Sequence, residues 1–181
     1  AGMSGSSLAA ADGRASALNG VVLQMLSHGI TAALLFGFVA LLERRTGGRR
    51  SMEDFGGIRL RAPVFAGLMG ISLFASLGLP GLSGFVGEFL IFKGVFAASP
   101  WAAALGAIGL LVTAVFLLGV IHRVFNGALN PDRSEFRDLT LPETLMFAPL
   151  VVLVVVVGVC PSLILQWMNP AQWDSLVSLA R

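Results

Sequence analysis

The sequence contains a single cysteine, Cys160, and only two histidines, His28 and His122. One cysteine cannot form an intramolecular disulfide, and no second His or Cys stands at a metal-ligand spacing, so we expect no metal site. A phosphate-binding loop, a catalytic triad and a flavin or quinone fingerprint are also missing. We therefore expect no bound cofactor and no redox chemistry in this chain.

Charged residues are scarce as well, at 12% of 181 residues, whereas 56% of the chain is hydrophobic. At about 1.5 Å per residue, four runs are long enough to cross a hydrocarbon core of about 30 Å. These runs are residues 20–43, 63–98, 101–125 and 143–168. The sequence therefore predicts an all-α integral membrane protein with four transmembrane spans. Residues 1–18, which are small and polar, are predicted to form a loop, and residues 169–181 an interfacial tail.

The basic residues are unevenly placed along the chain. Nine of the twelve lie in or beside two loops, six between the first two spans and three between the last two. The positive-inside rule then places the basic loops in the cytoplasm and both termini outside. This topology accounts for the net charge of +2 without a nucleic-acid partner. The chain begins in a loop with neither Met nor a signal peptide, so we expect a piece of a longer protein.

The first span carries a polar stripe. Gln24, Ser27, His28 and Thr31 fall within an arc of about 100° on a helix. Polar side chains at membrane depth must face protein or water, so this helix is expected inside a bundle. The third and fourth spans lack such a stripe and are expected to be packing or lipid-facing helices.

The second span is too long for one straight crossing, because 36 continuous helical residues would extend about 54 Å. Its middle, residues 78–84, holds the hinge candidates Gly78, Pro80, Gly81 and Gly84. Proline lacks an amide donor and glycine lowers the cost of leaving helical geometry, so we predict two half-helices, Pro63–Leu77 and Phe85–Ala98. Transporters place ion sites at broken helices of this kind.

Glu88 follows this break, and an acid at the centre of a membrane helix costs roughly 2.5–3.5 kcal/mol. Apolar surroundings penalise its charge, whereas a place in the first turn of the second half-helix would favour the anion. These opposed influences suit a proton carrier. The structural alternatives are an ion pair and an acid that is satisfied by its packing. His28 is the second candidate for a proton relay. The alternative is that it is a neutral histidine hydrogen-bonded to a neighbouring helix. Lys93 is a further candidate, but it lies 140° from Glu88 around the helix and is not its natural partner.

Two stretches resemble a known family. VLQMLSHGITAALLF, followed by a basic loop with the turn DFGG, and SLGLPGLSGFVGEFLIFKGVF are similar to the antiporter-like subunits of respiratory complex I. The type that resembles the chain most is subunit M, the chain-4 type, which is related to Mrp cation/proton antiporter subunits. The resemblance implies a bundle of fourteen helices, of which this chain matches the last four.

By that resemblance, His28 corresponds to a histidine of the central hydrophilic axis and Glu88 to the terminal proton carrier. It implies proton translocation coupled to quinone reduction, in a bacterial inner membrane, beside other membrane subunits of complex I. NADH, FMN, iron–sulfur clusters and quinone would belong to those partner subunits. Two alternatives remain open: an Mrp-type sodium/proton antiporter subunit, and a structural remnant that does not transport alone.

Overall fold

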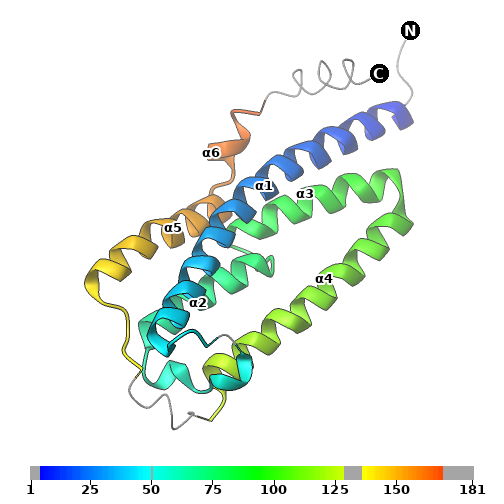
Figure 1. Ribbon diagram of the computed structural model, residues 1–181. Helices are drawn as coiled ribbons and strands as arrows, with labels where there is room; N and C mark the ends of the chain where they lie inside the picture. Colours follow the sequence, from blue (N-terminus) through cyan, green and yellow to red (C-terminus); the bar gives the residue numbers. More distant parts are fainter. Residues whose placement is uncertain (1–4, 50, 129–135, 169–181) are drawn as a thin grey trace.

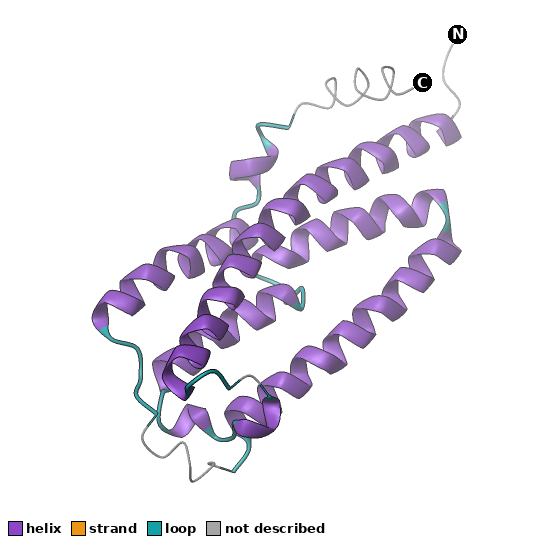
Figure 2. Cartoon of the chain, in the orientation of Figure 1, coloured by secondary structure: helices purple, strands orange, loops and turns teal. Residues whose placement is uncertain are grey.

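The computed structural model describes residues 5–49, 51–128 and 136–168, and these ranges contain helices and loops but no strand (Figure 2). In chain order the elements are α1 (Gly5–Thr46), η1 (Met52–Asp54), η2 (Ile58–Leu60), α2 (Pro63–Ser76), α3 (Ser83–Ala98), α4 (Pro100–Val120), η3 (Ile121–Asn126), α5 (Leu141–Val159) and α6 (Ser162–Leu165). Within them, Asp12–Thr46, Pro100–Asn126 and Leu141–Val159 are each long and apolar enough to cross a membrane. The predicted all-α membrane architecture is confirmed.

Helix α1 corrects the prediction of a loop over residues 1–18, because it already begins at Gly5 and continues to Thr46. The small residues that suggested a loop form a helix-packing surface instead. A Cβ added at Gly13 would lie 3.0 Å from the Cβ of Ala97, and one added at Gly94 would lie 2.6 Å from the Cβ of Ala17. Small side chains let two membrane helices approach closely, so this composition indicates a tight helix pair.

The second span is broken, as predicted, and both halves run antiparallel to α1 (Figure 1). Helix α3 follows the N-terminal part of α1, where Ser27 contacts Ser83 and Gly13 lies against Gly94. Helix α2 follows the C-terminal part. The break covers residues 77–82, slightly earlier than the predicted 78–84, because Ser83 and Gly84 are already helical.

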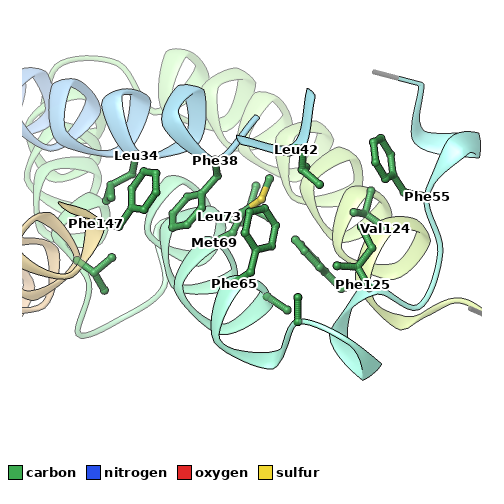
Figure 3. Packing of buried hydrophobic residues seen from close by; sticks show 14 of the residues in the cluster. Leu34, Phe38, Leu42, Phe55, Phe65, Met69, Leu73, Val124, Phe125 and Phe147 are labelled. Atoms are coloured by element: carbon green, nitrogen blue, oxygen red, sulfur yellow. The ribbon is translucent and has the colours of Figure 1, made fainter. Parts of the chain in front are cut away.

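An aromatic cluster joins α1, α2 and α5 (Figure 3). The ring of Phe38 stacks on Phe147 at a centroid distance of 4.2 Å and meets the edge of Phe65 at 5.4 Å. Phe65 also contacts Phe125 of η3 and Phe136, which precedes α5. Buried apolar area stabilises this end of the bundle and holds α2 against α1.

Helix α4 meets this cluster only at its C-terminal end, through Leu117 and Val120, and Ala103 is its one buried residue. Its exposed apolar surface agrees with the expectation of a packing or lipid-facing helix. Helix α5 begins with Pro142 in its first turn and a capping box between Thr140 and Glu143. It ends at Val159, before Pro161, which cannot donate a helical hydrogen bond. The predicted tail at residues 169–181 lies outside the described residues.

The two loops that hold most of the basic residues lie at one end of the bundle, opposite the turn between α3 and α4 (Figure 1). Arg45 pairs with Glu143 at 2.5 Å, and Arg49 with Asp54 at 3.5 Å. The described parts of both loops therefore lie together at one end of the bundle, which is compatible with the shared side that the positive-inside rule predicts.

Candidate functional site

The gap between α2 and α3 depends on two glycines with left-handed backbone. Gly78 has a φ of +72° and Gly81 a φ of +89°, values that cost other residues strain. Two turn hydrogen bonds close the segment, from the Leu79 amide to the Phe74 carbonyl and from the Leu82 amide to the Leu79 carbonyl, both 3.1 Å long. The unwound backbone is thus partly satisfied by its own turns.

Two further glycines let neighbouring helices press on this gap. A Cβ at Gly84 would collide with the carbonyl oxygen of Ala75, so α3 starts directly against the end of α2. A Cβ at Gly158 would lie 2.5 Å from the Gly81 carbonyl oxygen, so α5 packs on the unwound turn. Gly158 was not predicted from the sequence, although it is the one glycine of α5 and interrupts a run of valines.

Glu88 is half-buried, and its carboxylate lies against Gly78. A Cβ at Gly78 would overlap the Oε2 atom of Glu88 and stand 3.3 Å from Oε1. Among the residues that the structure describes, no cation forms an ion pair with this carboxylate. The expected position in the first turn is wrong, because α3 begins at Ser83 and Glu88 is its sixth residue. The helix dipole therefore acts on it less than the sequence suggested.

Two residues of the predicted polar stripe, Ser27 and Gln24, face α3. The hydroxyls of Ser27 and Ser83 are both buried and lie 2.7 Å apart. Thr31 is buried too, and its hydroxyl donates to the Ser27 carbonyl at 2.9 Å. The Oε1 atom of Gln24 lies against Gly87 and has no hydrogen-bond partner in the described part of the chain. The stripe thus supplies hydrogen-bonding groups against Ser83 and Gly87 of α3, the helix that carries Glu88.

His28 lies on the other edge of that stripe and is exposed on the surface of this chain. It lines an open groove of about 270 Å³ together with Thr31 and Ser76, the last residue of α2. No contact joins His28 to Glu88. The structure therefore brings the histidine beside Ser76, near the edge of the gap, but not into contact with the carboxylate.

Lys93 is exposed and makes no ion pair with Glu88, in agreement with the 140° that separates them on the helix. Across residues 5–49, 51–128 and 136–168, no group of three or more His, Cys, Asp and Glu side chains could hold a metal ion. What the site offers is one carboxyl at a gap in the backbone, with hydroxyl and amide groups nearby. Such a group can bind and release a proton.

Comparisons with known proteins identify relatives of this chain. The family model described as "NADH:quinone oxidoreductase/Mrp antiporter, TM" matches residues 4–117. NADH-quinone oxidoreductase subunit M of Mycobacterium tuberculosis is 36% identical over 163 residues, which cover 90% of this chain and 29% of that protein. The subunit M of Rickettsia bellii is 37% identical over 151 residues, or 83% of this chain and 30% of that protein.

A solved structure agrees with these sequences. Respiratory complex I from Thermus thermophilus with bound NADH contains a chain that superposes with a TM-score of 0.76 at 33% identity. The match covers 83% of this chain and 31% of that chain. The present chain thus spans about 30% of the length of the curated relatives that it matches.

Proposed function

Because the chain belongs to the NADH:quinone oxidoreductase/Mrp antiporter transmembrane family, we propose that it is part of a proton-translocating membrane subunit of complex I. Subunit M relatives that align with 82–90% of this chain support the choice of complex I. The observation that carries the proposal is Glu88, a carboxyl that forms no ion pair with any residue in the described ranges and is placed against the gap between two half-helices.

In the proposed mechanism, Glu88 takes up a proton from one side of the membrane and releases it to the other. The unwound turn at Gly78–Leu82 matters because its backbone can be satisfied only by protein or by water in a cavity. Water at the gap would give the carboxyl a route for protons. His28 is the second relay group, and the groove that it shares with Ser76 leads to the edge of the gap.

The hydroxyls of Ser27 and Ser83 and the amide of Gln24 would line this route as hydrogen-bonding supports. A single hydroxyl can accept one proton while donating another, so a serine pair suits a relay. Gly78, Pro80, Gly81 and Gly84 hold the gap open. No role is assigned to Lys93.

Redox chemistry belongs elsewhere in this proposal. NADH, FMN, iron–sulfur clusters and quinone would bind partner subunits, and this chain would lie in the bacterial inner membrane beside other membrane subunits of complex I. Its basic loops would face the cytoplasm. The competing function is that of an Mrp-type antiporter subunit, which belongs to the same family but has no redox partner. Purification of the native assembly separates the two, because quinone-oxidoreductase subunits accompany the chain in one case and small antiporter subunits in the other.

Substitution of Glu88 by Gln in the assembled complex tests the proposal. Glutamine keeps the shape and removes the titratable proton, so we expect fewer protons pumped per electron while the complex still assembles. Glu53→Gln, at an exposed residue of η1, is the matched control and leaves the ratio unchanged. Full pumping by the Glu88→Gln complex in reconstituted vesicles would overturn the proposal.

A further inference from the structure

The first half of the broken span is capped by a residue from the far end of the sequence. Ala62 precedes α2 and has no side chain that could cap the helix. Asp138 replaces that cap: its Oδ2 accepts a hydrogen bond from the Val64 amide and its Oδ1 one from the Phe65 amide, both 2.9 Å long. These amides would otherwise lack partners at the start of a helix.

Asp138 belongs to a short segment, residues 136–140, here named the strap. Arg45 of α1 binds this segment. The Nη1 atom of Arg45 donates to the Arg137 carbonyl at 2.6 Å, and its Nη2 atom donates to Glu143 at 2.5 Å. The guanidinium also lies 5.6 Å from the ring centroid of Phe136. The strap therefore connects the end of α1 with the starts of α2 and α5.

The electrostatics of the strap favour a charged Asp138. Partial burial raises the pKa of this carboxyl, but amide hydrogen bonds from Val64, Phe65 and Leu139 and the charge of Arg45 outweigh burial and lower the pKa. The charged groups that face it are Arg45 of α1 and, through Arg45, Glu143 of α5. An anion at a helix N-terminus is stabilised further by the helix dipole.

We propose that Asp138 is a positioning residue for the Glu88 site, an inference that rests on the function proposed above. Helix α2 has 14 residues, and a helix of that length is about 21 Å long and moves as one body. Asp138 fixes one end, and the other end leads into Gly78, against which the Glu88 carboxylate packs. Release of the cap would let α2 shift, loosen this packing and admit water to the carboxyl.

The test measures Glu88 itself in the assembled complex. Dicyclohexylcarbodiimide reacts with protonated carboxyls in apolar surroundings, and mass spectrometry gives the rate of modification at Glu88. Water favours the ionised form and so lowers the fraction of Glu88 that is protonated; we therefore expect Asp138→Ala to slow the modification at pH 7 by about threefold or more. Asp138→Asn retains one acceptor oxygen and is expected to give an intermediate rate.

Arg137→Ala is the matched control, because its exposed side chain can be removed while its backbone carbonyl still accepts from Arg45. A second readout is amide hydrogen exchange over residues 77–82, which should rise by about tenfold in Asp138→Ala, as expected for local opening, and stay unchanged in the control. If the complex with Asp138→Ala does not assemble, the modification and exchange rates of the Asp138→Asn complex decide whether Asp138 positions the gap. Wild-type modification and exchange rates in an assembled Asp138 variant would overturn the inference.

Failure of the positioning role of Asp138 can be distinguished from failure of the proposed function. Normal pumping by Glu88→Gln would remove the proton-carrier role of Glu88, whereas the modification and exchange rates would still report whether Asp138 positions the gap. Absence of modification at Glu88 in the unsubstituted complex would count against the proton carrier, and the exchange measurement would then decide the positioning role alone.

Discussion

The carboxylate of Glu88 rests against Gly78, so this acid touches the place where the second span is interrupted. The contact needs a residue without a Cβ at position 78, and the left-handed backbone there favours glycine for the same position. Gap and carboxyl are therefore two parts of one arrangement.

Gly78→Ala tests this contact. The added Cβ meets the Glu88 carboxylate, and the left-handed backbone adds roughly 1–2 kcal/mol of strain. Gly81→Ala is the matched control, because its φ is also positive but its Cβ would meet nothing within 4 Å. We expect a lower melting temperature for both variants and a larger loss for Gly78→Ala. Equal losses would contradict the contact; combination with Glu88→Ala should remove the difference.

Gly158→Ala tests the packing of α5 on the unwound turn. Its Cβ would stand 2.5 Å from the Gly81 carbonyl oxygen, and overpacking of this kind costs typically about 1–3 kcal/mol. Gly109→Ala in α4 has open space and gains about 1 kcal/mol of helix propensity. The melting temperature should therefore fall in Gly158→Ala and rise in Gly109→Ala, relative to the unsubstituted protein. A stabilised Gly158→Ala protein would show that α5 does not press on the gap.

The buried hydroxyl pair between α1 and α3 can be measured by a double-mutant cycle. Ser27→Ala leaves the Ser83 hydroxyl buried without a partner, whereas removal of both hydroxyls leaves nothing unsatisfied. We expect a coupling energy of about 0.6 kcal/mol, with an upper value near 1.7 kcal/mol for membrane helices. Unfolding in detergent with denaturant measures it, and strictly additive single losses would rule out the hydrogen bond.

The cap on α2 predicts a pH dependence. The folded pKa of Asp138 is lower than its ordinary value of 3.8, so its cap stabilises the fold fully above that value and loses effect as pH falls through the folded pKa. The difference in melting temperature between the unsubstituted protein and Asp138→Asn should be constant from about pH 8 to about pH 5 and shrink below about pH 4. A difference that instead grew in acid would contradict this sign.

Features that depend on local backbone chemistry were predictable from the sequence. Pro80 and the surrounding glycines indicated the broken span. Ser27 and Thr31 were correctly placed on a buried face, because helical periodicity alone determines which residues share a face. The resemblance to the complex I family is likewise confirmed by relatives that align with most of the chain.

Features that depend on contacts between distant segments were not predictable. Gly13 and Ala17 have a composition typical of loops, and only their fit against Gly94 makes them part of a helix interface. Gly158 and Asp138 act on segments more than 70 residues away, and no local pattern encodes such pairs. The exposure of His28 also depends on where α2 ends, which fixes the groove beside it.

Infrared difference spectroscopy tests the central claim most directly, because the carbonyl stretch of a protonated carboxylic acid reports proton binding at a single side chain. Spectra of the complex would be recorded before and during turnover for the unsubstituted protein, Glu88→Gln and the control Glu53→Gln. If Glu88 carries protons, a carboxylic-acid band changes during turnover, persists in Glu53→Gln and is missing in Glu88→Gln. Identical difference spectra for all three proteins would contradict this role.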